Sequence, residues 1–165
     1  MKILVYPNPF LRRPAEPVED TGEISDAASE MFRTMYENKG VGLAATQVGI
    51  GRRFFIMNIR GESGTERVLV NPEIVETRGE TVAVEGCLSV PGIELKIPRH
   101  EWVKIRATTL DGKEIELEGD GLFARAVQHE LDHLAGKLII DRVSPAARIA
   151  LKPRLKELEK KYPGK

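Results

Sequence analysis

The stretch QHELDH, residues 128–133, contains the pattern His-Glu-x-x-His, which brings three chemically useful side chains together. On a helix, His129 and His133 project from one face, one turn apart, as two ligands of one metal ion must. Glu130 then lies about 100° round the helix, where it can exchange a proton with a metal-bound water without ligating the metal. The pattern therefore predicts a metal-binding helix with its own acid–base residue.

A catalytic metal site needs a third protein ligand and an open position for water. Cys87, the only cysteine in the chain, is the leading candidate, because metal coordination keeps a thiol deprotonated and a thiolate is a strong ligand. It lies in EGCLSVP, residues 85–91, whose composition is unfavourable for a continuous core strand, and Gly86 gives the backbone room beside a metal. We predict that Cys87, His129 and His133 hold the metal and that water takes the fourth position.

Two other sources of the third ligand stay open. Glu157 and Glu159 lie at about the separation at which some zinc proteases carry a ligand glutamate, although their lysine-rich surroundings are typical of a solvent-facing helix. His100, in IPRHEWV, is more typical of a surface or hydrogen-bonding residue than of a ligand. A third histidine six residues after the second is excluded, because Ile139 occupies that position.

The metal-binding helix needs a scaffold, and the chain before it supplies candidates. A first helix begins near Asp20 or Thr21 as a cap and ends at Gly40. Its apolar face, at helical spacing, consists of Ile24, Ala28, Met31, Phe32 and Met35. Short β-branched or aromatic runs follow: RRFFIMNI, RVLVNPEIVE, ETVAVEG, IELKIP and EWVKIRATTL. Asp111-Gly112 then predicts a hairpin that joins the last run to KEIELEG.

Helical spacing returns in LFARAVQHELDHLAG, with Asp120 as a potential cap and Gly136 as the stop. A last helix begins at Ser144-Pro145, and Pro153 is expected to kink or restart it. This order predicts an α+β fold: antiparallel β-sheets packed around a central metal-binding helix, with an N-terminal helix and a C-terminal helix. At 165 residues, we expect residues 1–165 to form a single catalytic domain.

Composition excludes several classes of protein. The net charge of zero creates no global field that would recruit DNA. One cysteine permits no disulfide framework, which fits a reducing compartment. No signal peptide or membrane-spanning segment is recognisable, so we expect a cytoplasmic protein without a membrane partner. Residues 144–165 carry seven basic and two acidic residues, which is typical of a solvated helix face or of a docking element for an acidic partner such as RNA.

Three motifs together resemble a known family. GVGLAATQVG (40–49), EGCLSVP (85–91) and QHELDH (128–133) match, in order and spacing, the signatures of peptide deformylase. MFRTMYENKG, VLVNPEI and LAGKLIIDRVSP also resemble the bacterial enzyme, so the resemblance covers nearly the whole chain. The C-terminal helix, with no long insertion after the first motif, resembles the Gram-negative-like subtype, in which this helix can dock on the ribosome.

The resemblance implies a metal-dependent hydrolase that removes the formyl group from the N-terminal formyl-methionine of newly synthesised polypeptides and releases formate. It implies Fe(II) in the cell, with zinc, nickel or cobalt as substitutes, whereas the ligand set alone would indicate zinc. A metal-bound hydroxide attacks the formyl carbon in this family. The positions that match the oxyanion donors are the Gln47 side chain and the Leu88 backbone N–H, and Glu130 shuttles the proton.

The resemblance also implies how the substrate binds. An extended peptide pairs with exposed backbone beside Gly42 and Gly86, in the manner of strand addition. The positions that match the methionine pocket are Val41, Gly42, Leu122 and Ala126. Helical spacing independently puts Leu122 and Ala126 on the face that carries the two histidines.

Three charged residues near these motifs lie outside the metal-ligand and oxyanion sets. Arg99 is a candidate partner for Asp132 behind the metal-binding helix. Arg125 shares the ligand face, and we favour a surface residue whose stem packs on apolar neighbours. Glu94 is a departure from the family, because some members carry at this position an arginine within reach of the bound peptide.

Two alternatives to a deformylase differ in the groups that they require. A small metalloprotease would take its third ligand from Glu157 or Glu159 and would keep its metal without Cys87. A non-catalytic, metal-stabilised binding module would fill the fourth position with protein, and it would not need Gln47 or Glu130.

Overall fold

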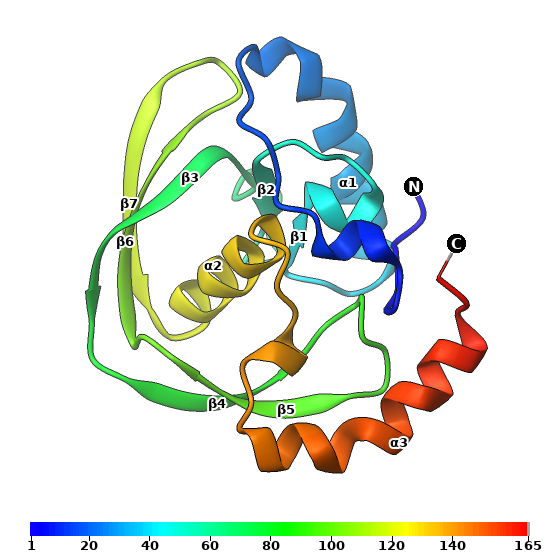
Figure 1. The fold of residues 1–165 in the computed structure, drawn as a ribbon. Coiled ribbons are helices and arrows are strands. Elements are labelled where there is room, and N and C mark those ends of the chain that lie inside the picture. The colour runs from blue at the N-terminus through cyan, green and yellow to red at the C-terminus, as the bar shows by residue number, and fades with distance from the viewer. Residues whose placement is uncertain (165) are drawn as a thin grey trace.

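The central element of the fold is the helix α2 (Gly121–Leu134), which the sheets and the other helices surround (Figure 1). The structure is a computed structural model that describes residues 1–164. An antiparallel sheet of order β1-β2-β3-β6-β7 curves around one side of α2, and β4 and β5 form a separate antiparallel pair. The strands are β1 (Gly42–Ala44), β2 (Phe54–Met57), β3 (Arg67–Arg78), β4 (Thr81–Gly86), β5 (Glu94–Arg99), β6 (Trp102–Thr108) and β7 (Glu114–Asp120). The predicted α+β architecture is confirmed.

The helix α2 is held in place by its apolar face. Ala124, Val127 and Leu134 are buried against side chains of the large sheet, including Phe55 and Ile105. Burying such side chains removes apolar surface from water, which contributes about 1.5–3 kcal/mol for each large one. The opposite face of α2 is therefore free to carry polar residues toward the pocket.

Both ends of α2 lie where the sequence predicts them, but only the C-terminal end has the predicted capping interaction. Asp120 occupies the N-cap position, yet its side chain accepts no capping hydrogen bond. At the other end, Gly136 adopts a φ of 75°, a left-handed conformation that glycine reaches without steric cost, and the helix stops there as predicted.

The first helix, α1 (Ser25–Glu37), covers the edge of the large sheet. A short 3₁₀ turn (Thr21–Ile24) precedes it, and the carboxylate of Asp20 caps that turn by accepting a hydrogen bond from the Gly22 N–H at 2.9 Å. The residues of its predicted apolar face pack on β1 and β2, and all except the half-buried Phe32 are fully buried: Ile24, Ala28, Met31 and Met35.

The predicted hairpin also forms. The strands β6 and β7 pair along their whole length and are joined at Asp111-Gly112, with Gly112 at a φ of 80°.

The third helix, α3 (Pro145–Lys161), begins where Ser144 caps it and lies at the periphery (Figure 1). It continues through Pro153 as one helix, so of the two predicted effects, a kink or a restart, the restart is wrong. Residues 1–164 contain no helix with both the length and the hydropathy to cross a membrane.

Candidate active site

The three predicted metal ligands converge. Cys87, His129 and His133 offer ligand atoms that all lie within 4.8 Å of one another. His133 Nε2 is 3.3 Å from Cys87 Sγ and 3.2 Å from His129 Nε2. Two nitrogen ligands about 2.1 Å from a metal, at a tetrahedral angle, would be about 3.4 Å apart, so the donor set fits one ion. The structure thus contains a metal site of one thiolate and two imidazoles.

Two different elements supply these ligands. The histidines lie one turn apart on α2, as their spacing predicts, and Cys87 follows the last residue of β4. A turn after the cysteine, in which the Val90 N–H donates to the Cys87 carbonyl at 3.0 Å, leads the chain toward β5. The interrupted strand that the composition of EGCLSVP predicts is therefore present, and the interruption delivers the thiol.

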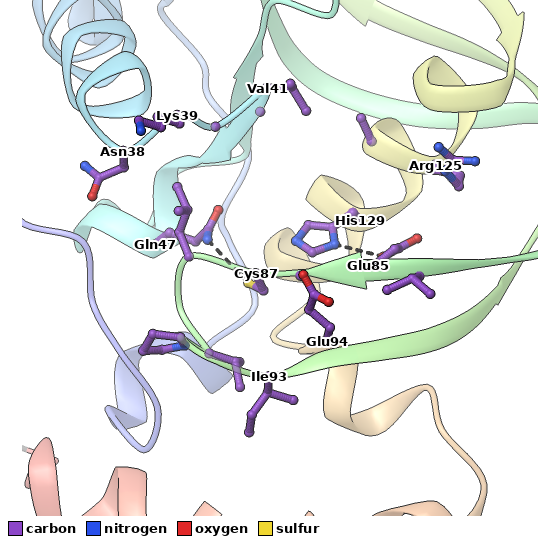
Figure 2. A pocket seen from close by; sticks show the side chains of 18 of the residues that line it. Asn38, Lys39, Val41, Gln47, Glu85, Cys87, Ile93, Glu94, Arg125 and His129 are labelled. Carbon is purple, nitrogen blue, oxygen red and sulfur yellow. Dashed lines mark hydrogen bonds and ion pairs between the residues drawn. The ribbon is translucent and has the colours of Figure 1, made fainter. Parts of the chain in front are cut away.

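A buried ionic network orients the metal site from behind. Arg99 donates to both carboxylate oxygens of Glu85 at 2.9 Å and to Asp132 at 2.7 Å, which confirms the Arg99–Asp132 pair. Arg142 also donates to Asp132, at 3.0 Å. Glu85 Oε2 lies 3.1 Å from His129 Nδ1, a contact that leaves Nε2 of this ring facing the other metal ligands (Figure 2).

Glu85 is the residue that sequence reasoning missed. Burial alone would raise the pKa of Glu85, but hydrogen bonds from Arg99 and His129 outweigh that effect and lower its pKa to about 2. It is therefore ionised, as a carboxylate that orients a histidine ligand must be. The sequence holds no signal for it, because the alternation of β4 would predict buried valines and an exposed glutamate. In the structure Val82 and Val84 are exposed, whereas Glu85 is buried and faces α2.

Glu130 is 4% exposed and lies on α2 beside the ligands. Its Oε2 atom has no hydrogen-bond partner among residues 1–164. Burial raises the pKa of Glu130 to about 7. A Cβ atom added to Gly42 would lie 2.7 Å from Glu130 Oε1, so β1 approaches this carboxylate as closely as a glycine allows.

Gln47 is 2% exposed, and its amide is oriented by three contacts. Its Oε1 accepts from the Ala44 N–H at 3.0 Å, which leaves Nε2 pointing the other way. Nε2 lies 3.0 Å from Ser89 Oγ and 3.9 Å from Cys87 Sγ, on the side of the metal ligands (Figure 2). The Leu88 N–H, also beside Cys87, donates to no acceptor in residues 1–164.

The metal site opens into a cavity of about 1030 Å³. The five residues predicted to contact substrate all line it: Val41, Gly42, Gly86, Leu122 and Ala126. Val41 and Leu122 are exposed, at 38% and 42%, whereas Ala126 is buried. Arg125, predicted to lie on the surface, is half-buried and lines the same cavity. Glu94 and Lys39 line it as well.

The alternative ligands are not part of this metal site. His100 is exposed, and its backbone N–H and carbonyl pair with the Gln128 side chain at 2.9 Å. Glu159 accepts a hydrogen bond from the Tyr6 hydroxyl at 2.8 Å, on the peripheral helix α3. The third ligand position belongs to Cys87, so neither His100 nor a glutamate of α3 completes the site.

Comparisons with known proteins agree with this geometry. The family model described as polypeptide deformylase matches residues 1–148. The peptide deformylase of Chromobacterium violaceum is 51% identical over 97% of this chain and 96% of its own. A crystal structure of a peptide deformylase from Legionella pneumophila superposes with a TM-score of 0.90 at 42% identity, covering 96% of this chain and 95% of that one.

A plant relative is equally similar in fold. Peptide deformylase 1B of Arabidopsis thaliana gives a TM-score of 0.93 at 37% identity and covers 98% of this chain and 92% of its own. The thiolate and two imidazoles, the buried glutamate and the open cavity therefore occur on a scaffold that this family shares. The chain belongs to the peptide deformylase family.

Proposed function

We propose that this deformylase removes the formyl group from the N-terminal formyl-methionine of newly synthesised polypeptides and releases formate. One observation carries the proposal: the three metal ligands meet at an open cavity beside a buried carboxylate, Glu130, that has an oxygen without a partner in residues 1–164. A purely structural metal site has no use for such a group, which costs free energy to bury.

We propose Fe(II) as the resident ion, with zinc, nickel or cobalt as substitutes, because sulfur and imidazole ligands suit all four. When bound, the ion supplies Lewis-acid activation of water and of the formyl carbonyl. Cys87, His129 and His133 would hold it, with Glu85 keeping the His129 ring in its orientation.

The chemistry then depends on three groups of the chain. Glu130 takes a proton from the attacking water as the carbon–oxygen bond forms, and it returns that proton to the peptide nitrogen as the carbon–nitrogen bond breaks. The Gln47 amide and the Leu88 N–H donate hydrogen bonds to the carbonyl oxygen as it becomes negative. What supports these assignments is their position: both donors flank Cys87, and the orientation of the Gln47 amide is held by Ala44.

The substrate would bind as an added strand. An extended peptide would form backbone hydrogen bonds with the chain beside Gly42 and Gly86. Its methionine side chain would enter between Val41, Leu122 and Ala126. The lack of a side chain at Gly42 and Gly86 allows the peptide backbone to approach closely.

We further propose that residues 1–165 work as one catalytic domain in the cytoplasm, and that α3 docks on the ribosome. Its buried leucines, Leu151, Leu155 and Leu158, face the protein, so its basic side chains remain outside. Co-sedimentation with ribosomes tests this: K156E/K160E, with both substitutions on exposed positions, should weaken binding, and unchanged binding contradicts the docking role.

The deciding experiment is formate release from a formyl-Met-Ala-Ser peptide, with protein purified without oxygen and reloaded with Fe(II). We expect turnover in the wild type and its loss in E130Q, with the metal content of both proteins measured in parallel. Loss of turnover with metal retained would support the acid–base role. Turnover in E130Q at the wild-type rate contradicts the proposed mechanism, and no turnover by the metal-loaded wild type contradicts the proposed function.

A further inference from the structure

We propose that Glu94 is a specificity-determining residue, which makes this enzyme favour formyl-methionyl peptides with lysine or arginine directly after the methionine. The inference rests on the proposed function, because it concerns the residue that follows the methionine in the same cavity. It is carried by the position of Glu94 relative to Gly86 and by the charges that line the cavity.

Glu94 opens β5, and its cross-strand partner is Gly86, the last residue of β4 and the neighbour of Cys87. A Cβ atom added to Gly86 would lie 4.0 Å from Glu94 Cγ, so the Glu94 side chain extends over the face of this glycine. Glu94 is exposed, and it makes no salt bridge or side-chain hydrogen bond with any group in residues 1–164. Its carboxylate is therefore available to a ligand.

The faces of the β4–β5 pair determine which substrate residue Glu94 can contact. Glu85 is buried on the face toward α2, whereas Val84 and Glu94 belong to the opposite, exposed face. Successive side chains of an extended peptide point to opposite faces. A peptide whose methionine points toward Ala126 of α2 must therefore direct its next side chain to the face of Glu94.

The distance also suits an ion pair across a glycine. A peptide added at the free edge of β4 would be two strands from β5, about 9.6 Å away at the usual spacing of about 4.8 Å per strand. A side chain at position 86 would normally fill that gap, but Gly86 leaves it open. A lysine or arginine of the peptide and Glu94 of the protein are together long enough to meet there.

No other charge that lines the cavity forms an ion pair with Glu94 in residues 1–164. Its other two lining acids, Glu85 and Glu130, are buried. Three Lys or Arg side chains of residues 1–164 line the cavity: Lys39, Arg125 and Arg154. Figure 2 shows Lys39 and Arg125 on the far side of Cys87 and His129 from Glu94. The Arg154 guanidinium donates to the Gly92 carbonyl at 2.7 Å instead of pairing with Glu94. Glu94 is thus the only exposed acid among the described residues that line the cavity. It lies apart from Lys39 and Arg125, and Arg154 is hydrogen-bonded to the backbone.

The test compares three amidated substrates, formyl-Met-Lys-Ala, formyl-Met-Ala-Ala and formyl-Met-Glu-Ala, with the metal-loaded full-length enzyme. We expect kcat/KM to be about three- to fivefold higher for the lysine peptide than for the alanine peptide, as one exposed ion pair allows, and lowest for the glutamate peptide. The preference should shrink as salt is added. E94Q should abolish it, and E94R should reverse it.

Glu80 supplies the matched control. It is an exposed glutamate directly before β4 that lines a different cavity, so E80Q should keep the lysine preference unchanged. A lysine preference that survives in E94Q, or equal values for all three peptides in the wild type, would overturn the inference. Failure of the wild type to process even formyl-Met-Ala-Ala would instead contradict the proposed function, so the two failures are distinguishable.

Discussion

The floor and the rim of the cavity differ in how their polar groups are held. The floor, defined here as Gln47, Glu85, Cys87, His129 and His133, is built from groups that contact one another or a buried partner. The rim, defined here as Lys39, Glu94 and Arg125, carries charges without an ion-pair partner in residues 1–164.

This difference shows where positional precision is required. A reacting centre needs fixed geometry, so its polar groups must be held by partners that cost nothing to reorganise during the reaction. A recognition surface needs only charged side chains that are free to bind a ligand. Water solvates such exposed charges, so leaving them unpaired costs little free energy. Substitutions in the floor should therefore have large effects on metal binding, stability or rate, and those in the rim should alter selectivity alone.

The largest effect is expected from Cys87→Ala. With one of three ligands gone, metal affinity should fall by more than the about 10- to 100-fold typical of losing an outer partner, and activity should fall with it. Metal content after dialysis measures this directly. His100→Ala is the matched control, because it removes an exposed histidine outside the site and should leave the metal bound. Metal retention by the Cys87 variant would contradict the ligand set.

Arg99→Met should have the next largest effect, because it leaves two buried carboxylates, Glu85 and Asp132, without their shared partner. We expect the free energy of unfolding to fall by about 3 kcal/mol, measured with urea at a fixed metal concentration. Arg78→Met provides the comparison, since Arg78 also pairs with a glutamate but its side chain is 64% exposed. A loss below about 1 kcal/mol is expected there. Equal losses of unfolding free energy in the two variants would show that the buried network stabilises the fold no more than the exposed ion pair does.

Gln47→Glu tests the donor role with little change in shape. The acceptor for the Ala44 N–H remains, but the donor that faces Cys87 is lost, and kcat should fall by about 10²- to 10³-fold. Ser89→Ala removes only the hydroxyl that contacts the same amide, so it should reduce kcat much less. Steady-state rates on a formyl-Met peptide separate the two variants. A rise in KM alone, with kcat unchanged, would contradict the oxyanion role, because it would show that Gln47 only helps to bind the substrate.

The smallest effect should come from an ion cluster outside the cavity. Burial raises the pKa of Asp141, but hydrogen bonds from Arg12, the Leu138 N–H and Arg148 outweigh it, so the folded pKa is lowered. This contribution to stability is complete above the unfolded pKa and is lost as the pH falls through the folded pKa. Asp141→Asn should thus cost about 1 kcal/mol near pH 7 and progressively less in acid, by thermal unfolding. A cost that does not change with pH would contradict the ionic origin.

Much of the site could be predicted from the sequence because its signals are local. His129, Glu130 and His133 lie within one helical turn, so their geometry follows from the rise and rotation of a helix. Cys87 stands out because it is the only cysteine and because the residues around it interrupt a strand. The Asp111-Gly112 hairpin is predictable for the same reason, since a turn is set by its own residues.

The parts that could not be predicted depend on contacts between distant segments. Glu85 and Arg142 meet their partners through the folding of three elements against one another, and neither residue carries a local sign of that role. Pro153 shows the reverse problem: a local rule predicted a kink or a restart, but the helix that buries Leu151 and Leu155 continues through it without a restart. Tertiary packing outweighs the local preference there.

Gly42 has a consequence for the evolution of resistance to inhibitors. A methyl group at this position would displace the Glu130 carboxylate, so the residue cannot be exchanged without cost to the chemistry. An inhibitor that uses the backbone at Gly42 and the metal ligands thus engages groups that mutation cannot easily alter. An inhibitor that depends on Glu94 or Arg125 engages side chains of the rim, where a single base change in the gene can abolish the contact while the enzyme keeps working.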